Sequence, residues 1–120
     1  MESPAGRILM VDDDAALLKV MATYLGRLGY AVDACRSAAE AWEKAQVGGG
    51  TYGWALVDLN MPGMPGEELA RRILEANAAT RVLVVSGYPG GDDRLQALDA
   101  SRVKFLHKPF KPQELAAALG

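Results

Sequence analysis

The chain has 120 residues, which suits one domain with a single hydrophobic core. Hydrophobic residues make up 50% of it and charged residues 23%, the balance of an ordinary globular protein. A net charge of −2 without a basic run argues against direct binding to nucleic acid, and no apolar run approaches the ~20 residues of a membrane-spanning helix.

The only cysteine, Cys35, has no partner for an internal disulfide and falls in an apolar run. We therefore expect a buried and unreactive thiol. Residues 1–6 contain no apolar signal region. These features predict a cytoplasmic protein that does not insert into membranes.

Short apolar runs alternate with amphipathic stretches from the beginning of the chain. The run 8–11 predicts a strand covered on both faces, and three aspartates end it. Apolar residues then recur every three or four positions over 15–28, which predicts a helix with one buried face, closed by Gly29. A second strand is predicted at 31–35.

Ser37 and Glu40 have the spacing of a capping box, which predicts a second helix from there to about residue 47. The glycines at 48–50 end it, and they are interpreted as a connection because no Lys-Ser or Lys-Thr pair follows to complete a phosphate-binding loop. The remaining predicted strands are 55–57, 82–85 and 103–106, and the remaining predicted helices are 67–76, 92–98 and 112 onwards.

Strict alternation of strands and helices predicts an α/β fold with a parallel sheet, right-handed crossovers and helices on both faces. We expect five strands in the doubly wound order 2-1-3-4-5, as in flavodoxin-like proteins. Residues 1–120 then form one domain, since the sequence has no internal repeat.

Polar side chains stand where the predicted strands end: Asp12 and Asp13 after the first, Asp58 after the third, Ser86 after the fourth and Lys108 after the fifth. The first and third strands are neighbours in this order, so their carboxylates converge. Three ionised carboxylates need a compensating cation, and a site with few protein oxygens favours Mg²⁺. The sequence therefore predicts a magnesium site, with Lys108 as a second positive charge.

Simpler interpretations exist for each residue taken alone. Asp58 is also explained as a cap of the following loop, because Asp is a common turn former, and Lys108 as an ordinary surface lysine. Asp14 is interpreted as the N-cap of the first helix. His107, the only histidine, is interpreted as a plain strand residue.

The chain resembles the receiver domain of two-component response regulators over essentially its whole length. The pair Asp12-Asp13, the segment 58–62, Ser86 after a β-rich run, and the segment 105–110 stand in that family's order. The loops after Asp58 and Ser86 are similar to those of receivers attached to hybrid sensor histidine kinases. Both a segment of such a kinase and a free-standing receiver are compatible with the resemblance.

The resemblance implies that Asp58 accepts a phosphoryl group from the phosphohistidine of a partner histidine kinase. Asp13, Asp58 and the backbone carbonyl of Asn60 would bind Mg²⁺ directly, and Asp12 largely through bound water. No enzymatic activity is implied beyond magnesium-dependent self-phosphorylation and autodephosphorylation.

The resemblance also assigns a switch. Lys108 would hold phosphoryl oxygens, Ser86 would donate its hydroxyl to one of them, and Phe105 would turn inward in response. The readout would be the face formed by the fourth helix, the fifth strand and the fifth helix. Phe105 stands where many relatives have Tyr, so switching must depend on packing and not on a phenol hydrogen bond. Ser101-Arg102 replaces a common Gly-Ala, and together with the Gly-Pro-rich loop after Ser86 this puts that face in doubt.

Three other classes remain as alternatives. A phosphohydrolase similar to haloacid dehalogenases would need a second carboxylate two residues after the nucleophile, where this chain has Asn60. A flavodoxin-like FMN protein would need a Ser/Thr/Gly loop after the first strand. A non-phosphorylated interaction module with the receiver fold would keep the architecture without the chemistry.

Overall fold

Five parallel strands form the centre of the computed structural model, which describes residues 7–48, 52–59, 66–77, 79–86, 101–108 and 110–119. The strands are β1 (Arg7–Val11), β2 (Ala31–Cys35), β3 (Tyr52–Asp58), β4 (Arg81–Ser86) and β5 (Val103–His107). The helices are α1 (Ala15–Arg27), α2 (Ala38–Gly48), α3 (Gly66–Ala76) and α5 (Pro112–Leu119). The helix predicted at 92–98 lies outside the described residues.

The strand order β2-β1-β3-β4-β5 confirms the predicted doubly wound sheet. β1 pairs in parallel with both β2 and β3, so the direction of winding reverses at β1. In the β1–β3 register Val11 stands opposite Val57. The next residue of each strand, Asp12 or Asp58, therefore emerges beside the other at the carboxyl end of the sheet.

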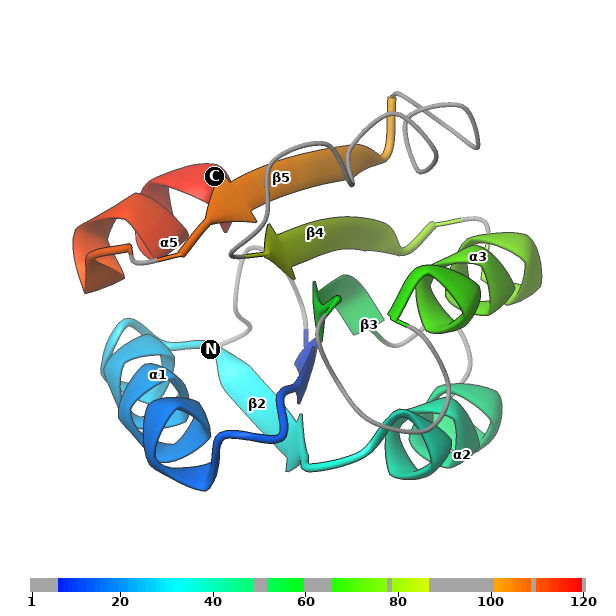
Figure 1. Ribbon diagram of the computed structural model, residues 1–120, viewed down its shortest axis with the longest axis horizontal. Coiled ribbons are helices and arrows are strands. Elements are labelled where there is room, and N and C mark those ends of the chain that lie inside the picture. The colour runs from blue at the N-terminus through cyan, green and yellow to red at the C-terminus, as the bar shows by residue number, and fades with distance from the viewer. Residues whose placement is uncertain are drawn as a thin grey trace.

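Helices cover both faces of the sheet, with α1 and α5 on one side and α2 and α3 on the other (Figure 1). Alternate residues of β1 enter different cores: Ile8 and Met10 pack with α1 and α5, whereas Leu9 and Val11 pack with α2 and α3. Burial on both faces explains why the strands read as continuous apolar runs.

The ends of α1 follow the predicted local signals. Asp14 is the N-cap, and its Oδ1 accepts a hydrogen bond from the backbone N–H of Leu17 at 3.1 Å. Gly29 follows the helix with a φ of 100°, a left-handed conformation that favours glycine. Within the described part of the chain, no helix is both long and apolar enough to cross a bilayer.

Two local predictions needed correction. At α2, the Ser37 hydroxyl caps the N–H of Glu40 at 3.2 Å as expected, but the Glu40 carboxylate accepts from Arg36 N–H at 3.1 Å, not from Ser37 N–H. β3 begins at Tyr52, three residues before the predicted apolar run. Gly53, between two aromatic residues, interrupts the apolar pattern, so the aliphatic run predicts only the later part of the strand.

Candidate functional site

Backbone hydrogen bonds continue the sheet by one residue beyond its carboxyl edge. Asp12 N–H donates to Cys35 O at 3.1 Å, Leu59 N–H to Val85 O at 3.0 Å, and Lys108 N–H to Ser86 O at 2.9 Å. These bonds fix the backbone at the points where polar residues follow β1, β3 and β5. The edge is therefore a rigid platform for side chains that are distant in sequence.

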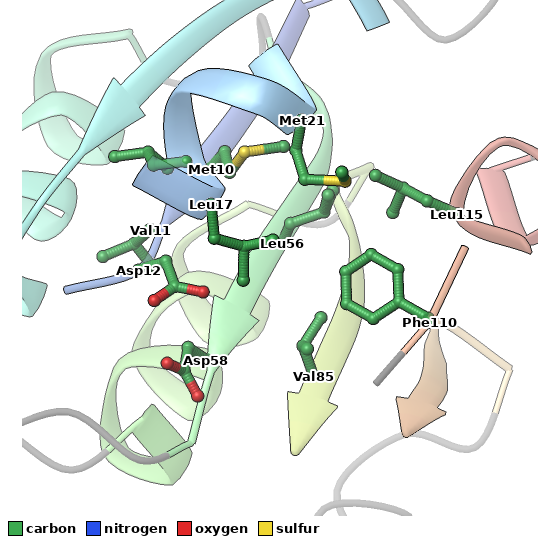
Figure 2. Close-up of a pocket in the computed structure, with 11 residues that line it drawn as sticks. Met10, Val11, Asp12, Leu17, Met21, Leu56, Asp58, Val85, Phe110 and Leu115 are labelled. Atoms are coloured by element: carbon green, nitrogen blue, oxygen red, sulfur yellow. The ribbon is translucent and has the colours of Figure 1, made fainter. Parts of the chain in front are cut away.

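Three carboxylates gather on this edge. Asp12, Asp13 and Asp58 each offer an oxygen, and these atoms lie within 4.8 Å of one another. Asp58 is 3% exposed and Asp12 is 7% exposed, while Asp13 faces solvent. Figure 2 shows the Asp12 and Asp58 carboxylates together at one end of an otherwise apolar pocket. The cluster is thus open to solvent on one side and borders an apolar pocket on the other.

Lys108 joins the fifth strand to this cluster. Its Nζ lies 3.2 Å from Asp12 Oδ2 and 3.3 Å from Asp58 Oδ2. One ammonium cannot neutralise three carboxylates, so the cluster retains an excess of negative charge.

Asp12 and Asp14, in the loop after β1, have different roles. Asp12 Oδ1 accepts the N–H of Asp14 at 2.9 Å, which turns the Asp12 side chain into the site. Asp14 points the other way, to cap α1. The interpretation of Asp14 as a helix cap is therefore confirmed.

The cluster shifts the acidity of its members. Burial raises the pKa of Asp12 and the charge of Asp58 adds to the rise, while the Asp14 N–H and the Lys108 ammonium oppose it without cancelling it. Burial lowers the pKa of Lys108, but the attraction of Asp12 and Asp58 outweighs burial and raises it overall. The pKa values of both partners of this ion pair are thus raised, because burial and a second carboxylate act on Asp12, whereas two anions act on Lys108.

The donor set fits a hard divalent cation. It consists of carboxylate oxygens, without nitrogen or sulfur ligands among the three clustered residues, which favours Mg²⁺ over a transition metal. Asp12, Asp13 and Asp58 are the described residues that would hold it. Asn60, predicted to contribute its backbone carbonyl, lies outside the described residues.

The other predicted residues lie along β4 and β5. Ser86 is the last residue of β4 and is buried. Phe105 stands opposite Val84 in the β4–β5 register and packs, half-buried, against the core beneath α2 and α3. His107 is an exposed strand residue, as expected, and Cys35 is a buried free thiol whose pKa burial raises to about 11.

Gly66 is a site-supporting residue that sequence reasoning missed. A Cβ at this first residue of α3 would lie 2.5 Å from Asp58 O and 2.8 Å from Leu59 Cα. Only glycine lets α3 begin against the backbone that carries Asp58. The Pro-Gly pair at 65–66 signals a turn, but the sequence does not reveal which backbone approaches it.

A family model for the response regulator receiver domain matches residues 8–120. The chain belongs to this family. Receiver domains of response regulators are signalling modules that histidine kinases phosphorylate, and the family typically binds Mg²⁺. This receiver therefore carries an acidic cluster that could hold a metal ion, in a family that typically binds Mg²⁺.

Individual relatives agree with this assignment. The transcriptional regulatory protein ResD of Bacillus subtilis is 34% identical over 109 residues, which are 91% of this chain and 44% of ResD. The receiver chain spans about half the length of the curated relatives it matches.

Two solved structures are also similar. The receiver domain of the hybrid histidine kinase CckA has a TM-score of 0.80 at 32% identity, covering 95% of each chain. A response regulator from Burkholderia pseudomallei, solved with a phosphorylated aspartic acid, calcium and citrate, has a TM-score of 0.82 at 27% identity, covering 96% of this chain and 66% of the other.

Proposed function

We propose that this receiver takes a phosphoryl group from the phosphohistidine of a histidine kinase onto Asp58, in the presence of Mg²⁺. The observation that carries the proposal is the placement of the Asp58 carboxylate, which lies within 4.8 Å of the Asp12 and Asp13 ligand atoms and 3.3 Å from Lys108 Nζ. The similar regulator from Burkholderia pseudomallei, with its phosphorylated aspartic acid, supports the same chemistry here.

The transfer is a displacement at phosphorus. An Asp58 oxygen forms a bond to phosphorus as the bond from phosphorus to the histidine nitrogen breaks, and the imidazole leaves with that electron pair and gains a proton. Lys108 offsets the repulsion between the carboxylate and the incoming phosphoryl oxygens. Mg²⁺ held by the acidic cluster would supply further positive charge at those oxygens.

The remaining residues take the roles that the resemblance implies. Asp13 and the Asn60 carbonyl would join Asp58 in holding Mg²⁺ directly, and Asp12 would act largely through water. Ser86 donates its hydroxyl to the new phosphoryl group, and Phe105 shifts further inward on β5. The surface of β5, α5 and the helix predicted at 92–98 carries the response to the next partner.

Phosphorylation by a small donor tests the proposal. The chain is incubated with Mg²⁺ and acetyl phosphate, and its intact mass is measured. We expect one phosphoryl adduct on the native chain, none on Asp58→Asn and none after chelation of Mg²⁺. Glu43→Gln, which removes an exposed carboxylate on α2 away from the cluster, keeps the adduct.

Two outcomes of this experiment would contradict the proposal. An unmodified native chain that still binds Mg²⁺ would favour the non-phosphorylated interaction module, whereas rapid turnover of a phosphomonoester would favour the phosphohydrolase.

We propose further that residues 1–120 form one receiver domain acting in the cytoplasm. Its output lies in a partner or an attached domain, since the matched regulators are about twice as long.

A further inference from the structure

An aromatic side chain with no role in the proposed chemistry, Phe110, lines the pocket beneath the acidic cluster. The lining residues of the pocket are Met10, Val11, Asp12, Leu17, Leu18, Met21, Leu56, Asp58, Val85, Phe110 and Leu115. Figure 2 shows the Phe110 ring reaching into this space on the side away from the two carboxylates. The ring leaves a cavity of about 20 Å³, enough for about one water molecule.

Phe110 belongs to the short connection that carries Lys108. The backbone N–H of Lys108 is bound to Ser86 O at 2.9 Å, which fixes the beginning of the connection to β4. Its other end is fixed where Lys111 N–H donates to Glu114 Oε1 at 2.9 Å, at the start of α5. Between these points, the Phe110 ring packs into the core between α1 and α5.

The contacts of Lys108 with the two carboxylates leave little room for further displacement. The Lys108 ammonium ends a flexible four-carbon stem, and its contacts of 3.2 Å and 3.3 Å are at the long end for hydrogen bonds. A displacement of the connection would move the ammonium away from one or both carboxylates. Water entering an enlarged cavity would also weaken the attraction between these charges.

We infer that Phe110 is a positioning residue for phosphoryl transfer: by packing between α1 and α5 it holds the connection that places Lys108 against Asp12 and Asp58. This inference rests on the proposed function. Asp58 is the last residue of β3, and Asp12 and Asp13 follow β1, so Phe110 carries none of the three carboxylates. Loss of the ring should therefore slow phosphoryl transfer and leave Mg²⁺ affinity nearly unchanged.

The test separates these two quantities in the full chain. We expect Phe110→Ala to lower the rate constant for phosphorylation by acetyl phosphate, at saturating Mg²⁺, by about tenfold, because a displaced catalytic group loses its alignment. The Kd for Mg²⁺, measured by calorimetry, should change by less than about twofold, and Phe110→Leu should recover most of the rate because it refills the pocket. Leu119→Ala, a truncation in the same core at the far end of α5, should leave both quantities unchanged.

A double-mutant cycle identifies the residue through which Phe110 acts. In a Lys108→Ala background, adding Phe110→Ala should slow phosphorylation by less than about twofold, since the group to be positioned is gone. An undiminished tenfold effect in that background would overturn the inference. So would a normal rate in Phe110→Ala, or a Mg²⁺ affinity that falls in parallel with the rate.

A second measurement does not depend on phosphorylation. Acetic anhydride modifies lysines according to their exposure and free-amine fraction, and the modified sites are read by mass spectrometry. We expect Lys108 to react about fivefold faster in Phe110→Ala than in the native chain, because its ion pairs are weakened, and not to change in Leu119→Ala. Unchanged labelling of Lys108 in Phe110→Ala would overturn the positioning role, whether or not the native chain is phosphorylated. A native chain that takes up no phosphoryl group would refute only the proposed function.

Discussion

The two ends of the central sheet treat charged side chains in opposite ways. At the amino end, the Tyr52 hydroxyl donates to Asp33 Oδ2 at 2.6 Å, and Arg7 pairs with the same carboxylate. Burial, the hydrogen bond and the Asp33 charge together raise the pKa of Tyr52 to about 12. At the carboxyl end, Lys108 faces the crowded carboxylates of Asp12 and Asp58.

Arg102 extends the pattern of the amino end. Its guanidinium donates to the carbonyls of Leu74, Asn77 and Thr80 at 2.8 to 3.1 Å, and thereby caps the end of α3. Its own carbonyl accepts the N–H of Val82 at 2.8 Å. The departure from the common Gly-Ala at 101–102 is thus a structural clamp between α3, β4 and β5.

Charges that stabilise this fold therefore differ from charges that serve its function in whether the fold supplies their partners. Charges at the amino end are matched by partners that the fold itself supplies. At the carboxyl end, three carboxylates face the single ammonium of Lys108. Without a bound cation their repulsion lowers the stability of the fold, and a divalent cation would relieve it. Substitutions at the two ends should therefore differ in whether Mg²⁺ binding changes along with stability.

The largest effect is expected at Gly66, which supports the carboxyl end. Gly66→Ala forces a methyl group against the backbone of Asp58, and we expect a loss of about 3 kcal/mol in the free energy of unfolding together with weaker Mg²⁺ binding. Urea denaturation and calorimetry measure the two effects.

Gly26→Ala is the matched control for this substitution. A Cβ there meets nothing within 4 Å, so the variant should gain about 0.5 to 1 kcal/mol in the free energy of unfolding through higher helix propensity. A Gly66→Ala variant as stable as Gly26→Ala would contradict the tight approach of α3 to Asp58.

A smaller effect, confined to stability, is expected at the amino end. Arg102→Ala leaves three carbonyls without their charged donor and should cost about 2 kcal/mol in the free energy of unfolding, without a change in Mg²⁺ affinity. Arg71→Ala, which removes only exposed ion pairs on α3, should cost about 0.5 kcal/mol or less. Equal losses in the two variants would show that the clamp adds nothing.

Substitution of Asp12 is expected to have the smallest effect, and to increase the free energy of unfolding. A raised carboxyl pKa means that the folded protein binds this proton more tightly than the unfolded chain, for which the pKa of Asp12 is near 3.8. Without Mg²⁺, this group's contribution to stability is therefore largest below pH 3.8 and is lost as the pH rises through the raised folded value.

Asp12→Asn removes that penalty. At pH 7 and without Mg²⁺ we expect a gain of about 1 kcal/mol in the free energy of unfolding, and an affinity for Mg²⁺ about tenfold lower. Asp14→Asn, which keeps a good N-cap, should leave both quantities close to native. A destabilised Asp12→Asn variant would mean that its hydrogen bonds outweigh the repulsion from Asp58.

Much of the architecture was readable from the sequence because its signals are local. Apolar runs and three-to-four periodicity predicted β1, β2, β4, β5 and the helices that the structure describes to within a residue or two. Asp14 and Gly29 marked the ends of α1 through their own backbone preferences. Alternation of strands and helices then predicted the strand order, because few ways of winding a parallel sheet are allowed.

The tertiary structure alone decided which distant groups touch. The sequence named Asp12, Asp58 and Lys108 as candidates from their positions after strands, but only the folded chain sets the Lys108 ammonium between the two carboxylates. It likewise decided that Gly66 lies against Asp58 and that Phe110 lines the pocket beneath the cluster. Such contacts join residues far apart in the chain, and their geometry depends on packing that no local preference encodes.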